Sequence, residues 1–376
     1  MINKITYIHT SPLNSKKANI IQVLSMCNAF IENAIDVTLM LPKSEFLSDT
    51  KLDNKINLKF YRVNNRLPSF LKYNIAISKY LKNNSLEGLI FIRHYTLVFP
   101  LSKFKYKFIY ESHNNNLFSN KVIDVLFKFH LKKLIKNDNF LLLFSISGEL
   151  NKYWDKFFKK STEKIDFYHD GISAQMFETF LEKDAALLSL GINKTMRKRI
   201  VYSGSIYNDR GIDSIVRLAK DFPMADFIVI GGPSSNIPKL ESMASKLNIE
   251  NIVFLGVIRH REIPLYLFSA DVLLAFWSNK VKTINYCSPL KVFEYMASGR
   301  LILAHAYPTI KEVLNDTNSI LVNPNSYEKI KEGLHKALKI NNSSVIAEKS
   351  RRDVFSNYTW TIRAKYVINR INQIDE

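Results

Sequence analysis

The chain has 376 residues, 47% of them hydrophobic, which is enough for two globular domains and excludes a disordered composition. Its 53 lysines and arginines exceed its 34 aspartates and glutamates, and the formal net charge of +19 favours an anionic partner. Two cysteines exclude a disulfide framework, and no apolar run reaches the roughly 18 residues of a membrane span. Since the N-terminal segment is too short and polar for a signal peptide, we expect a cytoplasmic protein.

Strand-like and helix-like segments alternate through the first half of the chain, which predicts a parallel sheet with crossover helices. The predicted strands cover residues 4–9, 36–41, 56–63, 89–93, 108–111 and 140–145, and the predicted helices cover residues 18–33, 69–82, 117–136 and 149–158. One doubly wound domain accounts for all of these elements. Ligands of such a sheet bind beyond the carboxyl ends of its strands.

Polar residues follow two of these predicted strands. The segment 10–17 contains no glycine, so it fits either phosphate binding by side chains or a plain surface loop. Glu111 and His113 lie just past a buried strand and before a helix. An imidazole in either protonation state can hydrogen-bond a sugar or an attacking hydroxyl, although a lone histidine is more often structural.

The second half repeats the strand–loop–helix pattern. Strands are predicted over 200–205, 227–232, 252–258 and 270–274. Helices are predicted from the residue after Asp213 to Phe222 and over 262–269. The free N–H groups at the start of a helix that follows such a loop form a phosphate cradle. A basic residue of the first loop, Arg210, could add a bidentate contact to phosphate.

A short helix is predicted between Ser288 and Gly299, followed by a buried strand from Arg300. Lys291 and Glu294 lie three residues apart and so share one face of this helix. The helix start and Lys291 attract phosphate, and Glu294 can accept hydrogen bonds from paired sugar hydroxyls. The alternative is an ordinary amphipathic helix whose lysine and glutamate are solvated.

This segment resembles the signature E-x7-E of retaining GT-B glycosyltransferases of family 4. Glu294 matches the second glutamate, which in that family holds the ribose of the donor, while the loop backbone holds its diphosphate. Tyr286 stands where the family has its first glutamate, so the recognition of the donor sugar differs. Ser205 and Arg210 stand where the family has an Arg and a Lys that clamp the diphosphate, and His113 matches a histidine beside the transferred sugar.

The resemblance implies an α/β GT-B fold of two Rossmann-like doubly wound domains that face each other across a cleft. Residues 1–185 would form the acceptor-side domain, residues 186–356 the nucleotide-sugar donor domain, and residues 357–376 a helix crossing back to the first domain. The implied catalytic residues are His113, Arg210, Lys291 and Glu294. The implied donor-binding residues are Gly204, Ser205, Val257, Ile258, Asn285, Tyr286, Ser288, Pro289 and Leu290.

The resemblance also implies a sugar transfer from a nucleotide-diphospho-sugar, with retained configuration and without cofactor or essential metal. By analogy with other enzymes of this fold, we expect a glycan or lipid-linked acceptor in capsule or lipopolysaccharide synthesis. Residues 122–136 are apolar at helical spacing and carry Lys128, Lys132, Lys133 and Lys136. This helix either packs on the core with a solvated lysine face or docks on anionic lipid at the inner face of the plasma membrane.

Three other functions are compatible with the sequence. A nucleotide-sugar epimerase shares the two-sheet architecture and needs no acceptor. A catalytically silent partner subunit would explain Tyr286 and Ser205. A nucleic-acid-binding module would use the charge, but no recognised nucleic-acid-binding motif accompanies it, and we expect no nucleic-acid partner.

Overall fold

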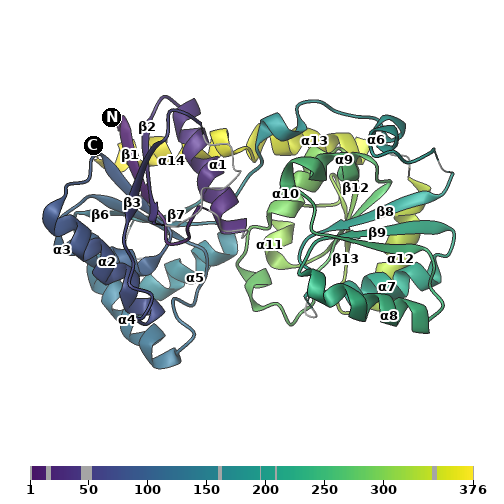
Figure 1. Ribbon diagram of the computed structural model, residues 1–376, viewed down its shortest axis with the longest axis horizontal. Helices are drawn as coiled ribbons and strands as arrows, with labels where there is room; N and C mark the ends of the chain where they lie inside the picture. Colours follow the sequence, from purple (N-terminus) through teal and green to yellow (C-terminus); the bar gives the residue numbers. More distant parts are fainter. Residues whose placement is uncertain are drawn as a thin grey trace. The chain divides into compact units, whose positions relative to one another are not determined.

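The computed structural model (Figure 1) describes residues 2–13, 18–43, 53–159, 163–194, 196–207, 210–340 and 345–375. Part of the predicted loop 10–17 thus lies outside the described residues. The chain divides into two compact units, the first comprising residues 1–170 and 360–376 and the second residues 171–359. Each unit has its own sheet and its own helices.

The first unit contains a seven-stranded sheet of order β3-β2-β1-β4-β5-β6-β7 with parallel pairing throughout. Its strands are β1 (Lys4–Ile8), β2 (Asp36–Pro42), β3 (Asn57–Tyr61), β4 (Leu89–Ile92), β5 (Phe108–Ser112), β6 (Phe140–Ser145) and β7 (Ile165–Phe167). Its helices are α1 (Ala18–Glu32), α2 (Ser69–Asn83), α3 (Val98–Lys103), α4 (Lys121–Leu134), α5 (Gly148–Phe158) and α14 (Trp360–Asp375). The strand order reverses between β1 and β4, and this reversal marks the ligand-binding edge of such a sheet.

The last helix, α14, completes the first unit although it follows the whole second unit in the chain. It packs along α1 (Figure 1), where Asn33 Nδ2 donates to the carbonyl oxygen of Thr361 over 3.0 Å. Arg363 Nε donates to the carbonyl oxygen of His169 over 3.0 Å. The C-terminal segment is therefore part of the first domain's structure.

The second unit contains a six-stranded parallel sheet of order β10-β9-β8-β11-β12-β13. Its strands are β8 (Lys198–Ser203), β9 (Ala225–Ile230), β10 (Ile252–Gly256), β11 (Val272–Ala275), β12 (Leu301–His305) and β13 (Ile320–Val322). Its helices are α6 (Lys183–Ser189), α7 (Ile212–Asp221), α8 (Ile237–Lys246), α9 (Ile263–Phe268), α10 (Leu290–Ala297), α11 (Pro308–Lys311), α12 (Tyr327–Lys339) and α13 (Val345–Asn357). The central strands are buried on both faces, as expected of a sheet covered by crossover helices.

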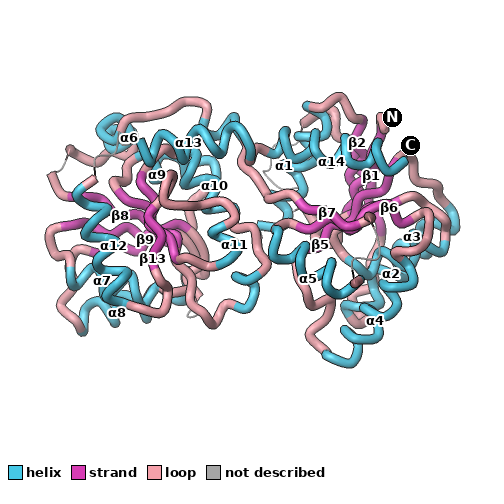
Figure 2. The backbone as a smooth tube through the Cα atoms, turned by 180° about the vertical axis from the view of Figure 1, so that it is seen from behind, coloured by secondary structure: helices cyan, strands magenta, loops and turns pink. Residues whose placement is uncertain are grey.

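Alternate residues of the second sheet enter two separate cores. Val201 and Leu273 pack with α9 and α10, whereas Tyr202 and Leu274 pack with α7, α8 and α12. Figures 1 and 2 show these two groups of helices on opposite sides of the second sheet. The period of two along each strand therefore places helices on both faces.

The structure ends the second unit at 359/360, close to residue 357 where the sequence analysis expected its end, but begins it at 170/171 and not near residue 185. The reason is that Ile172, Phe177 and Ala186 are buried in the core of the second unit. The segment 174–190 forms a 3₁₀ turn at Ala174–Phe177 and the helix α6.

Both sheets have the doubly wound, Rossmann-like strand order, which confirms the predicted class of two α/β domains. Within the described ranges, the structure contains no helix with the length and apolarity needed to span a bilayer.

Candidate active site

Glycines close the carboxyl ends of three neighbouring strands in the second unit. Gly204 follows β8 and donates its N–H to the carbonyl oxygen of Ile230 over 2.9 Å, and Gly231 donates to Gly256 over 2.7 Å. Gly231 has a φ of 140°, and a Cβ built there would lie 1.7 Å from the carbonyl oxygen of Gly204. Only glycine fits this approach, so the strand ends form an open backbone surface at the point where the sheet order reverses.

Helix α10 is fixed over this edge by Tyr295. Its buried hydroxyl accepts the N–H of Ser203 over 2.7 Å and lies 3.2 Å from the carbonyl oxygen of the same residue. This contact joins the helix to the end of β8. Lys291, one turn earlier on the same face of α10, and Glu294, the residue before Tyr295, are positioned as a consequence.

The start of α10 presents backbone N–H groups to the same edge. The helix begins after Pro289, and no side-chain hydrogen bond caps it among the residues that the structure describes. Uncapped N–H groups and the helix dipole favour an anion here. Ser288, which precedes the helix, is buried, so the approach of the chain is fixed by packing.

Lys291 lies between two aromatic rings. Its Nζ is 4.2 Å from the ring centre of Tyr202 and 4.1 Å from that of Trp277, and it donates to the carbonyl oxygen of Phe276 over 3.3 Å. Burial, together with the charge of Arg210, lowers the pKa of Lys291 well below its ordinary value. An anionic ligand would stabilise the charged forms of Lys291 and Arg210 by pairing with both of them. These two residues are therefore a suitable phosphate site.

Glu294 is held by a residue that the sequence analysis did not single out. Its Oε1 lies 2.7 Å from Nε2 of His260, at the start of the segment that leads into α9. The Glu294 side chain is only 13% exposed. The second carboxylate oxygen is therefore the one left to receive a pair of ligand hydroxyls.

The remaining predicted donor-binding residues follow the strand ends. A Cβ on Gly232 would lie 2.7 Å from Val257, so the segment Val257–Ile258 lies against the end of β9. Ser205 is exposed, and its carbonyl oxygen accepts the hydroxyl of Tyr202 over 2.8 Å. Asn285 ends a 3₁₀ turn, and the adjacent Tyr286 donates its N–H to Thr283 over 3.0 Å.

The fourth predicted catalytic residue, His113, belongs to the first unit. Its Nδ1 lies 3.0 Å from a guanidinium nitrogen of Arg93, and its Nε2 is hydrogen-bonded to Glu111. Burial and the charge of Arg93 lower the pKa of His113 to about 4. The ring is therefore neutral near pH 7, and a bond to substrate requires the exchange of one of these two partners.

A buried ionic network surrounds Glu111 at the strand ends of the first unit. Arg363 lies 2.9 Å from Glu111 and 3.8 Å from Asp170. Burial would raise the pKa of Glu111, but the charges of Arg363 and Arg93 hold it below its ordinary range. Burial raises the pKa of Asp170 to about 7. The nearby His9 is 3% exposed, and neither ring nitrogen has a hydrogen-bond partner within the described part of the chain.

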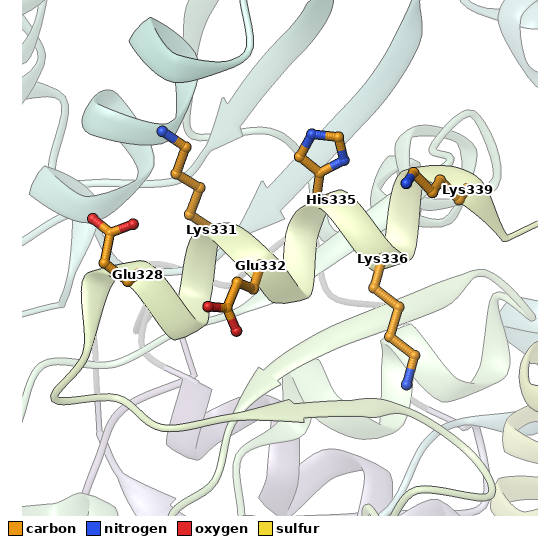
Figure 3. A pocket seen from close by; sticks show the side chains of 6 residues that line it. All are labelled: Glu328, Lys331, Glu332, His335, Lys336 and Lys339. Carbon is orange, nitrogen blue, oxygen red and sulfur yellow. The ribbon is translucent and has the colours of Figure 1, made fainter.

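A surface pocket elsewhere in the second unit is unrelated to these strand ends (Figure 3). Its lining residues, Glu328, Lys331, Glu332, His335, Lys336 and Lys339, all come from α12. In Figure 3, Lys331 and His335 point to one side of the helix and Glu332 and Lys336 to the other. Lys331 is paired with Asp221 over 2.9 Å. Since the side chains do not converge, we assign no ligand to this pocket.

Comparison with known proteins agrees with the site in the second unit. Residues 190–354 match the family described as glycosyl transferases group 1, and this match spans the strand ends of the second unit. The second unit of this glycosyltransferase therefore contains a group 1 glycosyltransferase domain. An uncharacterized glycosyltransferase of Methanocaldococcus jannaschii is 21% identical over 360 residues, covering 84% of this chain and 90% of its own length.

Solved structures show that this glycosyltransferase has the GT-B fold. Sucrose-phosphate synthase of Thermosynechococcus elongatus has a TM-score of 0.79, with 14% identity and 99% of each chain covered. HepE of Anabaena, solved with UDP and glucose, has a TM-score of 0.71 and 12% identity, with 98% of this chain and 99% of HepE covered. WaaG, a glycosyltransferase involved in lipopolysaccharide biosynthesis, has a TM-score of 0.67 and 14% identity, with 96% of this chain and 98% of WaaG covered.

The structure brings Lys291, Glu294 and the glycine-bearing strand ends together on one edge of the second sheet. Sequence reasoning missed His260, Tyr202 and Trp277, which surround the two charged residues. Tyr202 and Trp277 could have been found, since each lies at the end of a strand that flanks the order reversal. His260 is 34 residues from Glu294, and no local pattern connects them.

Proposed function

We propose that this glycosyltransferase takes its sugar from a nucleoside-diphosphate sugar bound at the edge formed by β8, β9, β10 and α10. The observation that carries the proposal is the combination of Lys291 with the uncapped start of α10, one helical turn from a fixed Glu294 carboxylate. This arrangement offers cations and N–H groups for a diphosphate and a hydrogen-bond acceptor for a ribose. The UDP and glucose in HepE support the same ligand class.

In this proposal the protein's own positive groups stabilise the leaving diphosphate. Lys291, Arg210 and the N–H groups of α10 are in place before the reaction, so they need little reorganisation as charge develops. Glu294 holds the ribose and so sets the position of the reacting carbon. The reaction would then retain the configuration at that carbon and proceed without a metal ion.

We further propose that the acceptor is a lipid-linked glycan of a bacterial surface polysaccharide, used at the inner face of the plasma membrane. The similarity to WaaG supports lipopolysaccharide-type synthesis at the level of fold. The charge distribution supports an anionic surface, because residues 1–170 and 360–376 contain 29 lysines and arginines against 16 aspartates and glutamates.

Two other functions are distinguished from this proposal by the test below. An epimerase would convert the nucleotide sugar without any acceptor. A silent partner subunit would bind no donor, and Tyr286 in place of the family's first glutamate is the observation that favours it.

The test is a chromatographic assay of the purified protein with UDP-, GDP-, ADP- and TDP-sugars in EDTA, with and without a lipid extract from the source cells. Release of the free nucleotide that depends on the extract supports the proposal, and NMR of the product then shows whether configuration is retained. An altered nucleotide sugar formed without extract would identify an epimerase. No turnover and no nucleotide binding would identify a silent subunit.

A further inference from the structure

Helix α4 (Lys121–Leu134) of the first unit has an inverted polarity: it buries a charged pair and exposes large apolar side chains. Its start is firmly fixed, because Asn120 Oδ1 accepts the N–H groups of Val122 and Ile123 over 3.0 and 3.2 Å. The sequence analysis left two interpretations of this helix open, a core-packing helix with a solvated lysine face and a helix that docks on anionic lipid. The structure shows that one of the four lysines considered there, Lys128, is buried.

The face of α4 that packs on the domain carries an ion pair beside the buried Leu131. Asp124 and Lys128 are buried and form an ion pair of 2.7 Å, one helical turn apart. Asp124 also accepts the backbone N–H groups of Leu117 and Phe118 over 2.5 and 3.0 Å, and the Lys128 ammonium lies 5.3 Å from the ring centre of Tyr153. These contacts fasten the preceding loop and α5 to the helix, so the polar pair cannot turn outward without losing them.

The opposite face of α4 exposes large apolar side chains. The exposed fractions are 69% for Val122, 63% for Val125, 63% for Leu126 and 65% for Phe129. Their spacing of three, one and three residues places all four on one stripe of the helix. A contiguous exposed apolar stripe of this kind is typical of a surface that binds another protein or a membrane.

Positive charge surrounds this stripe. Lys121 precedes it and Lys133 and Lys136 follow it, and all three are exposed. Lys132 lies 4.4 Å from the ring centre of Phe157, so it is held against α5. The charge favours anionic lipid over a second copy of the chain, because two copies meeting through α4 would bring the same lysines together.

We propose that α4 lies in the surface of an anionic membrane, with Val122, Val125, Leu126 and Phe129 in the apolar layer and Lys121, Lys133 and Lys136 at the headgroups. The helix runs from the carboxyl end of β5 toward the start of β6, so its apolar stripe begins at the edge of the sheet where ligands bind. Docking of this kind would bring the enzyme to a lipid-linked acceptor. That benefit rests on the proposed function, whereas docking itself needs no donor.

The first experiment measures sedimentation of the full chain with phosphatidylglycerol-containing vesicles and with phosphatidylcholine vesicles. The wild type is expected to bind the anionic vesicles, and the triple variant Val125→Gln, Leu126→Gln, Phe129→Gln should bind at least about tenfold more weakly. The matched control replaces Leu188, Met196 and Met224 of the second unit by Gln, since these are 80%, 94% and 77% exposed. The control should bind as the wild type does.

The second experiment tests the charges with Lys121→Glu, Lys133→Glu and Lys136→Glu against the exposed lysines Lys220, Lys246 and Lys336 changed in the same way. Loss of anionic binding in the first set alone supports the proposal. Lys128 is left unchanged because it is buried and paired.

Three results would overturn the proposal: no binding of the wild type to anionic vesicles, equal binding of the α4 variant, or a wild-type dimer that the α4 variant dissociates. Nucleotide binding by the α4 variants, measured in parallel, reports folding of the donor site. Absence of nucleotide binding, or of turnover that depends on an acceptor, would contradict the proposed function but leave vesicle binding intact, so the two failures are distinguishable.

Discussion

Nε2 of His260 lies 2.7 Å from Oε1 of Glu294, and this contact joins the segment after β10 to helix α10. The carboxylate proposed to hold the donor ribose is thereby fixed at the end of its side chain, in addition to its attachment to α10. A glutamate free to rotate would lose entropy on binding a ligand, whereas a fixed one has already lost it. His260 is therefore a positioning residue for Glu294.

His260 makes this contact dependent on pH. Burial would lower the pKa of His260, but the hydrogen bond and charge of Glu294 raise it above the ordinary 6.5. The charged pair therefore stabilises the fold fully below pH 6.5, and its contribution is lost as the pH rises through the higher pKa of the folded state. His260→Gln should cost about 1 kcal/mol or less, since the imidazole is 37% exposed.

The measurement is the denaturation midpoint of wild type and His260→Gln from pH 5.5 to 9. The difference between the two proteins should be largest at the acidic end and shrink toward pH 9. A difference that grows with pH would contradict the charged pair.

Lys291 should matter for ligand binding more than for folding. Lys291→Met keeps the length of the side chain and removes a charge that burial disfavours, so the melting temperature should stay within a few degrees or rise. Binding of a nucleoside diphosphate should weaken about 10- to 100-fold, as expected for the loss of a charge-assisted hydrogen bond. Calorimetric titration and thermal denaturation measure the two effects, with the exposed Lys311→Met as control. Unchanged nucleotide affinity would refute the assignment.

Tyr295→Phe should destabilise the second unit. The change removes the hydroxyl that accepts the N–H of Ser203, leaving a buried donor without its partner, at a cost of about 1–3 kcal/mol. Tyr327→Phe is the control, because its hydroxyl bonds Asp221 near the surface. Urea denaturation compares them, and an equal effect of both changes would show that the contact with β8 is unimportant.

Arg363→Met should destabilise the first unit by about 3–5 kcal/mol, because it leaves the buried Glu111 carboxylate without its closest guanidinium partner. Arg370→Met breaks a more exposed pair with Asp166 and should cost about 1 kcal/mol or less. Hydrogen exchange of the β5 and β6 amides reports the stability of this unit. Protection that is the same in both variants would contradict a structural role for the network.

Local patterns predicted much of the second unit. The apolar runs around Val201 and Leu273 form buried strands, and the helix predicted between Ser288 and Gly299 is α10. These elements could be predicted because turn residues bound each run and the helix start has a proline. The proposed phosphate site lies beyond the carboxyl ends of the strands, where the expected doubly wound sheet places ligands.

Contacts across long sequence separations could not be predicted. The pairing of His260 with Glu294 and of Arg363 with Glu111 depends on tertiary packing, since the partners lie 34 and 252 residues apart in the sequence. The inversion of α4 has another cause. Helical periodicity groups Val122, Val125 and Leu126 on one face, but it does not tell which face packs inward. The pairing of Asp124 with Lys128 decides that in the structure.

The most direct test of the donor site is a calorimetric titration of UDP, GDP, ADP, TDP and CMP in EDTA, with wild type, Glu294→Ala and Glu262→Ala. Glu262 is a suitable control because it is 42% exposed and lies only two residues from His260. We predict that the wild type and Glu262→Ala bind one of these nucleotides equally and that Glu294→Ala binds it about 100-fold more weakly. Equal binding by all three proteins, or binding of none of the nucleotides by the wild type, would contradict the donor site described here.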